Sequence, residues 1–227
     1  GITAPTGWDD VELVTGEDIV DASATGTDLT VTTVRLDAGR NIGENTASNP
    51  LETAVATLIA EADGTDGINI DNTGDVVATL NAPNGTATLN VQSTLTTGGA
   101  WGADEFDVDV DGDVNLDHNV TTDTAAGMDF NSSAGVISIG AGVTLSSATG
   151  NGPITLRSDD MDIDGTATIT AGGGTVSLVP NDGKTVDLGD ASTKDYTLSD
   201  AELDTVTAGL LVIGQSSAGA IVVSDAA

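Results

Sequence analysis

A run of alternating aspartates, DEFDVDVDGDVNLDH, is the part of this sequence whose spacing first suggests chemistry. Four positions of an EF-hand loop, the first, third, fifth and sixth, are matched by Asp107, Asp109, Asp111 and Gly112. In such a loop the carboxylates bind Ca²⁺, and a glutamate at the twelfth position supplies two further oxygens. Here the twelfth position is His118, and neither flank has the pattern of a helix. The EF-hand interpretation is therefore weak.

A β-strand explains the same spacing more simply. Phe106, Val108 and Val110 alternate with the aspartates, and a period of two is typical of a strand with one buried face. Gly112 then turns the chain toward a second strand that begins at Val114. We interpret the run as strand, turn and strand, with the carboxylates on a solvated face.

A cation on that outer face is kept as an alternative. Aspartates on one face of a strand lie about 6.5–7 Å apart, and stacked strands bring others to about 5 Å. Bound Ca²⁺ would relieve their repulsion, and its ligands would be Asp107, Asp109, Asp111 and Asp113. A second acidic edge, SDDMDID (158–164), receives the same interpretation: a solvated face is favoured.

The other residues with chemical potential are few and scattered. His118 is the only histidine, and we expect it on the surface or in a turn. The glycine run at 171–175 lacks the Lys-Ser/Thr of a phosphate-binding loop, which predicts a tight turn. The chain has no cysteine, which excludes disulfides and thiolate chemistry. We therefore predict no catalytic residue, no enzyme activity and, apart from the surface Ca²⁺, no cofactor.

The charge balance excludes several classes of partner. The chain has 36 acidic and 5 basic residues, a formal net charge of −31. Nucleic-acid binding needs clusters of Lys and Arg, so nucleic acid is not expected as a partner. No apolar run reaches the roughly 20 residues that cross a bilayer, so no transmembrane segment is expected either. The sequence begins and ends like a segment or processed piece of a larger exported chain.

Short apolar pairs separated by one residue recur along almost the whole chain, and Gly, Asn, Asp, Ser and Thr lie between them. They are grouped in threes: one set begins at Ile154, Met161 and Ala167, and the next, roughly 22 residues later, begins at Val176, Val186 and Tyr196. A repeat of about 20–26 residues with three short strands indicates stacked coils that share one core. The sequence predicts an all-β fold, a right-handed parallel β-helix (β-solenoid) of roughly nine or ten coils, as one domain over 1–227.

Two segments depart from this pattern. Residues 49–62 have Leu51, Val55 and Leu58 at helical spacing, although Leu58 and Ala60 could equally belong to a strand. Residues 199–209 carry Ser199 and Glu202 at the spacing of a capping box, which predicts a short helical insertion between coils.

Two passages resemble very large bacterial exoproteins of the filamentous-haemagglutinin-like type. They are VATLIAEADGTDGINIDNTGDV (55–76) and YTLSDAELDTVTAGLLVIG (196–214), the latter followed by GAIVVSD (219–225). The resemblance implies a β-helical stalk, export across the outer membrane by two-partner secretion, and an adhesive role outside the cell or on its surface. It also implies that residues 58–60 form a strand, and it carries over no catalytic residue.

The function expected from these observations is structural: a rigid, acidic, non-catalytic stalk or adhesin segment. Both ends of a β-helix expose unpaired strand edges, so other copies or further repeats of the same chain are expected partners. Host or cell-surface glycans or proteins are further candidates. Two alternatives remain open, a calcium-dependent surface binding module and a polysaccharide lyase or hydrolase on a β-helix scaffold.

Overall fold

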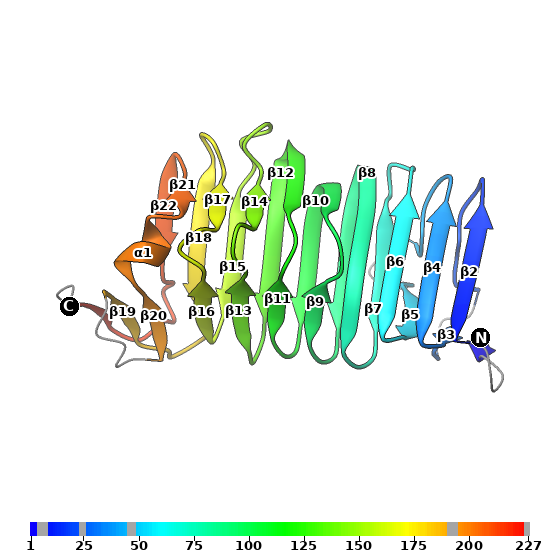
Figure 1. Ribbon diagram of the computed structural model, residues 1–227, viewed down its shortest axis with the longest axis horizontal. Helices are drawn as coiled ribbons and strands as arrows, with labels where there is room; N and C mark the ends of the chain where they lie inside the picture. Colours follow the sequence, from blue (N-terminus) through cyan, green and yellow to red (C-terminus); the bar gives the residue numbers. More distant parts are fainter. Residues whose placement is uncertain (4–8, 23–25, 45–48, 190–194, 225–227) are drawn as a thin grey trace.

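The computed structural model describes residues 1–3, 9–22, 26–44, 49–189 and 195–224. These residues form an elongated stack of short strands, with the two termini at opposite ends of the long axis (Figure 1). Neighbouring strands in the stack are parallel and come from successive passes of the chain. The fold is therefore a parallel β-solenoid, which confirms the fold class predicted from the sequence.

The first face of the solenoid contains a stack of strands that runs from one end of the molecule to the other. Its members, in order, are β1 (Ile2–Thr3), β3 (Leu29–Thr30), β5 (Leu51–Ala54), β7 (Ile68–Asn72), the second parts of β8 (Val76–Val91), β10 (Trp101–Val110) and β12 (Val120–Ser132), then β15 (Ile154–Ser158), β18 (Thr175–Pro180) and β22 (Leu210–Ile213).

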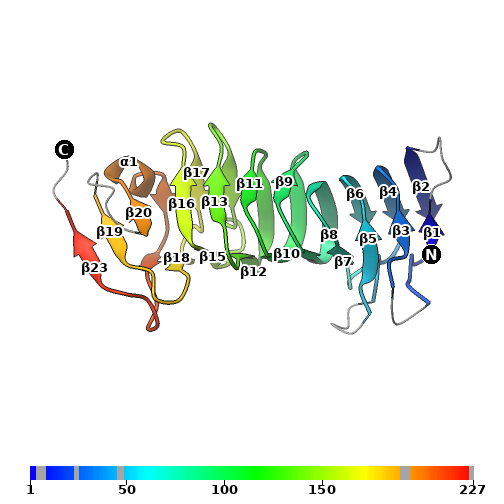
Figure 2. The same ribbon diagram turned by 90° about the horizontal axis from the view of Figure 1, so that it is seen from below.

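The second face begins with long strands and continues with shorter ones. Its members are β2 (Asp10–Thr15), β4 (Thr33–Ala38), β6 (Thr57–Ala62), the first part of β8, β9 (Leu95–Thr97), β11 (Val114–Leu116), β13 (Val136–Ile139) and β16 (Asp160–Ile163). Beyond β16 lie β20 (Tyr196–Leu198), β19 (Val186–Leu188) and β23 (Ile221–Val223), as Figure 2 shows.

A third face appears in the middle of the molecule, where one long strand is replaced by two short ones. The first part of β8 pairs with β9 through residues 76–78 and with β10 through residues 81–82. Gly98 and Gly99 form the corner between β9 and β10, close to β8: a Cβ on Gly98 would lie 2.8 Å from Val77 Cγ1. A larger residue at position 98 would therefore displace the Val77 side chain. The third face continues through β12, β14 (Thr144–Ser146), β17 (Thr168–Thr170) and β21 (Val206–Thr207).

The number of turns differs slightly from the prediction. About seven regular turns are present, whereas the sequence predicts nine or ten coils. The turn nearest the C-terminus is interrupted by β19, β20 and the helix α1 (Asp200–Leu203).

Inward side chains from successive turns stack into continuous columns, which is why the alternating apolar pattern is so regular. One column of register partners contains Ile42, Ile68, Ala87, Phe106, Met128, Ile154, Val176 and Leu211. A second contains Leu51, Ile70, Leu89, Val108, Phe130, Leu156, Leu178 and Ile213. Each turn covers the inner side chains of the next, so no turn has a core of its own.

The few aromatic residues are concentrated in the middle of this core. Trp101 lies 5.6 Å from Phe106 and 6.2 Å from Phe130, measured between ring centroids. The Trp101 indole Nε1–H donates a hydrogen bond to the carbonyl oxygen of Ala78 (2.8 Å), so its polar group is satisfied inside the core. The cluster fills the interior where the third face begins.

The structure decides between the two interpretations of residues 49–62. They form β5 and β6, so the helical spacing of Leu51, Val55 and Leu58 does not produce a helix. All three side chains are buried, because they point into the solenoid from strands that meet at a corner. In the segment 199–209 the structure contains the one-turn helix α1, and Ser199 and Glu202 form both hydrogen bonds of a capping box.

Candidate functional site on the outer surface

The aspartate run crosses a corner of the solenoid, as its strand interpretation predicts. β10 ends at Val110 and β11 begins at Val114, so the run is strand, turn and strand. Within the run, the inward side chains of β10 are Phe106, Val108 and Val110, each at most 2% exposed. Asp107 and Asp109 face outward, and Asp111 and Asp113 lie in the turn. The EF-hand interpretation is therefore wrong.

The structure does not gather the four expected cation ligands into one cluster. Asp113 accepts a hydrogen bond from the backbone N–H of Val136 (2.9 Å), and Asp111 accepts one from the Ser133 hydroxyl (3.4 Å). Both carboxylates of the turn thus contact the next turn of the solenoid. A cation shared by Asp107, Asp109, Asp111 and Asp113 stays a prediction.

Charge is distributed along the chain in blocks that are about one turn long. The acidic segment, residues 104–129, has nine acidic side chains and no Lys or Arg. The first neutral segment, residues 76–103, and the second neutral segment, residues 130–156, contain no Asp, Glu, Lys or Arg at all. Because position along a solenoid follows position in the sequence, the acidic turn lies between two uncharged ones. This arrangement limits repulsion between adjacent turns.

One outward column of the first face shows this alternation residue by residue. Register partners along the column are Asp71, Asn90, Asp109, Asn131 and Arg157. Asn90 Nδ2 donates to Asp71 Oδ1 (2.5 Å), and Asn131 Nδ2 donates to Asp109 Oδ1 (2.8 Å). Each asparagine separates two charged neighbours and donates a hydrogen bond to a carboxylate. From Asp71 to Arg157 the column therefore places no two carboxylates side by side, although Asp71 has Glu52 as its partner in the preceding turn.

The adjacent outward column breaks this rule at one point. Asp107 and Asp129 are direct register partners in adjacent turns. They are 22 residues apart, and the acidic segment is slightly longer than this distance, so it contains both. Partial burial raises the pKa of Asp107, with a further increase from the charges of Asp109 and Glu105. Partial burial also raises the pKa of Asp129, and Asp107 adds to the increase while Arg157 opposes it. Sequence reasoning missed Asp129, although its distance of one turn from Asp107 was a usable signal.

The two aspartates border a shallow hollow of the first face. Its lining includes Glu105, Asp107 and Asp129, together with Pro153 and Thr155 of the next turn. Three carboxylates and a hydroxyl are oxygen ligands of the kind that hard cations prefer. The arrangement could attract a cation, but it also suits a solvated acidic surface.

A tighter acidic group lies at the N-terminal end and was also missed. Asp21, Asp28 and Glu52 each offer one carboxylate oxygen within 4.8 Å of the others, and no other such group of three occurs in the part of the chain that the structure describes. Burial raises the pKa of Glu52, and its hydrogen bond with Asp28 and the charges of Asp21 and Asp28 add to the effect. These residues are far apart in the sequence, so only the stacking of turns brings them together.

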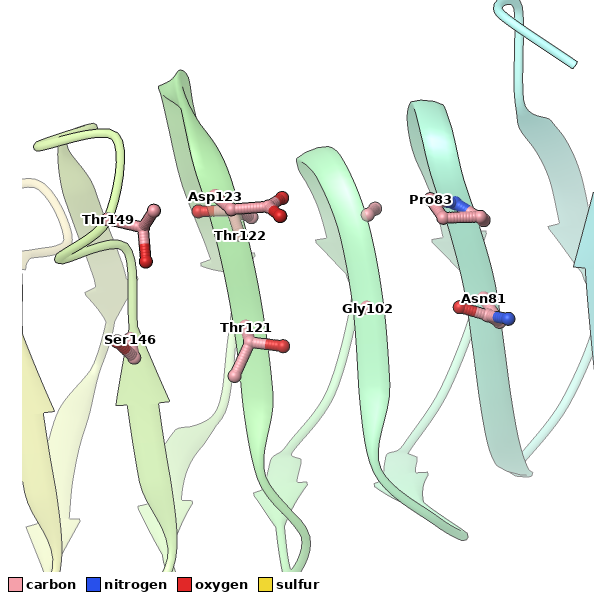
Figure 3. Close-up of a pocket in the computed structure, with 9 residues that line it drawn as sticks. Asn81, Pro83, Gly102, Thr121, Thr122, Asp123, Ser146 and Thr149 are labelled. Carbon is pink, nitrogen blue, oxygen red and sulfur yellow. The ribbon is translucent and has the colours of Figure 1, made fainter. Parts of the chain in front are cut away.

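A polar groove crosses the third face at the level of the aromatic cluster (Figure 3). Asn81, Gly102, Thr121 and Ser146 are successive register partners, and Gly102 leaves a gap between the side chains of Asn81 and Thr121. Asp123 and Pro83 border the gap. Thr122, only 4% exposed, also lines it, and its hydroxyl has no hydrogen-bond partner. The groove therefore offers hydroxyl, amide and carboxylate groups to a small polar ligand.

The remaining candidates hold ordinary structural positions. His118 is exposed in the turn after β11, where its Nδ1 lies 2.8 Å from the carbonyl oxygen of Thr97. The glycine run at 171–175 is a turn that leads into β18. Within the described ranges, no helix is long and apolar enough to cross a membrane. Comparison with protein-family models, with curated proteins and with solved structures finds no match to this chain.

Proposed function

We propose that this chain is a non-catalytic segment of a rigid stalk or adhesin on the outside of a bacterial cell. The single observation that carries the proposal is the continuity of the core. Two columns of inward side chains follow the first face through successive turns, as far as Leu211 and Ile213. Such a core supports a long narrow body in preference to a compact one.

Stiffness follows from the same arrangement. Bending the rod would separate adjacent turns on its convex side, which requires breaking parallel backbone hydrogen bonds and exposing inward side chains to water. The outer surface adds solubility, because a net charge of −31 keeps such rods apart in dilute salt. Because the acidic segment lies between two neutral segments, charge repulsion between adjacent turns destabilises their stacking only a little.

The location outside the cell rests on the resemblance of residues 55–76 and 196–214 to filamentous-haemagglutinin-like exoproteins. Antibody labelling of intact cells of the organism that makes the protein tests it. Labelling without permeabilisation is the expected result, and labelling only after permeabilisation would contradict the location.

The structural role is tested by single-molecule stretching together with enzyme assays. Pulling from both termini should give unfolding steps of about one turn each, because turns contact only their neighbours. A panel of acidic and neutral polysaccharides should show no turnover. Cleavage of any of them, lost when Asp107 and Asp129 are replaced by Asn, would favour the polysaccharide-hydrolase alternative instead.

A second candidate function, binding of a saccharide unit, is favoured by the polar groove. Its hydroxyl, amide and carboxylate groups suit a hydroxyl-rich ligand. Titration with a panel of neutral saccharides, followed by NMR or calorimetry, tests this role. Gly102→Val fills the gap on an outward strand position and should abolish binding without unfolding the protein. Equal binding by the wild type and Gly102→Val would reject the groove as the site.

A further inference from the structure

Side-chain oxygen atoms converge on the gap in the polar groove of the third face. Asn81 of β8 and Thr121 of β12 lie on either side of Gly102, and the carboxylate of Asp123 points toward the same gap from farther along β12 (Figure 3). A Cβ on Gly102 would lie 3.5 Å from Asn81 Oδ1 and 3.9 Å from Thr121 Oγ1. A ligand atom placed over Gly102 would therefore meet oxygen atoms from two neighbouring turns.

The hydrogen-bond donors of the same side chains are used within the protein. Asn81 Nδ2 donates to Glu61 Oε1 of the preceding turn (3.4 Å), so the amide nitrogen faces away from the gap. The Thr121 hydroxyl donates to the backbone carbonyl oxygen of Trp101 (3.3 Å). The gap thus offers acceptors to a ligand, and it suits a ligand group that donates several hydrogen bonds.

Asp123 adds a full negative charge that no basic side chain balances. Its carboxylate is exposed, and it makes no hydrogen bond or ion pair with another side chain in the described part of the chain. Residues 76–156, which include this turn and both of its neighbours, contain no Lys or Arg, and Arg157 lies on the first face. A hollow with charge of one sign raises the local concentration of the opposite ion.

We infer that the groove binds a protonated amino sugar, whose ammonium group lies over Gly102 and donates to Asn81 Oδ1 and the Asp123 carboxylate. An ammonium group has three N–H donors and no acceptor, which matches the oxygens at the gap. Ser146 and Thr149 line the groove beyond Thr121 and offer hydroxyls to the rest of the sugar. The inference rests on the saccharide binding proposed above for this groove, and it names the chemical class of the saccharide.

Size and charge both favour this class. The hollow has a volume of about 320 Å³, and small-molecule sites begin at about 300 Å³. An acidic sugar would be repelled by a chain with a net charge of −31, and a neutral sugar would leave the charge of Asp123 without a counter-ion. Quaternary ammonium ligands bind to the faces of aromatic rings, and the aromatic side chains of the described residues are all buried.

Isothermal calorimetry with two disaccharides of the same shape tests the inference. One is the β-1,4-linked disaccharide of glucosamine, and the other is cellobiose, which has hydroxyls where the first has amines. At mildly acidic pH and low salt, the glucosamine disaccharide should bind about tenfold or more tightly, because a hydrogen bond between charged groups is stronger than a neutral one. Its affinity should fall severalfold as salt is added, because the carboxylate is exposed.

Three variants locate the effect. Asp123→Asn keeps the shape of the side chain and removes its charge, so the two disaccharides should then bind with similar affinity. Asp162→Asn is the matched control, because it removes the same charge from an exposed position on the second face and should keep the preference. Gly102→Val fills the gap and should abolish binding of both disaccharides. Circular dichroism and thermal melts should show that all three variants are folded.

Four results would overturn the inference. Equal affinity of the wild type for the two disaccharides would do so while leaving saccharide binding in place. A preference that survives in Asp123→Asn, or is lost equally in Asp162→Asn, would indicate general attraction of cations to an acidic rod. Putrescine, a diamine without hydroxyls, binding as tightly as the glucosamine disaccharide would indicate an ammonium site that does not recognise a sugar. No binding of either disaccharide would reject the groove as a saccharide site as well, and the structural role of the rod would stand.

Discussion

The acidic segment and the neutral segments on either side of it have similar interiors and different exteriors. Inside, Phe106, Val108 and Val110 of the acidic segment stack on Ala87, Leu89 and Val91 of the first neutral segment. On the outer surface the acidic segment has nine acidic residues, whereas the first neutral segment has no charged residue. The comparison indicates that the inward positions determine the fold and that the outward positions are free to carry charge, even where two carboxylates are register partners, as Asp107 and Asp129 are.

The largest expected effect tests whether the interiors are equivalent. Phe106→Ala in the acidic segment should lower the free energy of unfolding by about 3–5 kcal/mol, and Leu89→Ala in the first neutral segment by about 2–5 kcal/mol. Both side chains are at most 1% exposed, so each change leaves a cavity in the core. Urea denaturation monitored by circular dichroism measures both. A loss below 1 kcal/mol in only one segment would show that the interiors differ.

The next effect concerns the alternating column. Asn90→Asp places a carboxylate between Asp71 and Asp109 and removes the hydrogen bond to Asp71. We expect a loss of about 1 kcal/mol at pH 7, since like charges directly opposite each other in a sheet are destabilising. Asn90→Thr is the control, because it removes the same donor without adding charge. If the two variants unfold at the same urea concentration, charge separation is not the role of Asn90.

A smaller effect of opposite sign is expected where the alternation fails. Asp129→Asn removes the carboxylate next to Asp107 and should stabilise the protein at neutral pH by about 0.5 kcal/mol or less, because both side chains face solvent. The pKa of Asp129 is raised in the folded state, so its ionisation costs stability above that pKa. The cost is removed as the pH falls through the raised pKa toward the ordinary value near 3.8.

The gain from Asp129→Asn should therefore shrink as the pH is lowered, and thermal melts from pH 7 to pH 4 measure it. Asp162→Asn, at an exposed position whose neighbour in the preceding turn is Ser138, is the control and should show little change. A gain that persists unchanged at pH 4 would mean that ionic repulsion is not its source.

The smallest effect separates screening from specific cation binding. At constant ionic strength, replacing Na⁺ by Ca²⁺ should change the melting temperature of the wild type by no more than about 1–2 °C, the range of small surface effects. A larger rise that is lost in Asp107→Asn would support a surface Ca²⁺ site, whereas one lost in Glu52→Gln would place the ion at the N-terminal acidic group. Chelation by EDTA is the reverse measurement.

The inward side chains could be predicted from the sequence because every second side chain is buried in a strand with one buried face. Phe106, Val108 and Val110 are inward as predicted, and the aspartates between them are outward. The prediction is less accurate near the C-terminus: Leu211, Ile221 and Val223 follow the same alternation but are exposed, since no further turn among the described residues covers them. The period of two predicts whether a side chain points inward or outward. Burial of an inward side chain also requires an adjacent turn that covers it.

The outer surface was harder to predict because it depends on register between turns. Asp107 meets Asp129, and Asp21 meets Asp28 and Glu52, only once the length of each turn is known. Those lengths vary, as at the glycine corner that divides one long strand into β9 and the start of β10. The groove at Gly102 also depends on register, because this residue without a side chain lies between the outward side chains of two adjacent turns.

The strand order at the C-terminal end determines how the rod would come apart under tension. β20 follows β19 in the chain but lies against β16, where the N–H of Thr197 donates to Asp160 Oδ1 (2.8 Å), and β19 is held between β20 and β23. Unwinding from this terminus must remove β23, β22 and β21 before it reaches β20, and β20 must leave before β19 is free. β20 therefore lies between β16 and β19, although it follows β19 in the chain. Because of this strand order, we expect the C-terminal end to resist unwinding under tension more than a regular turn does.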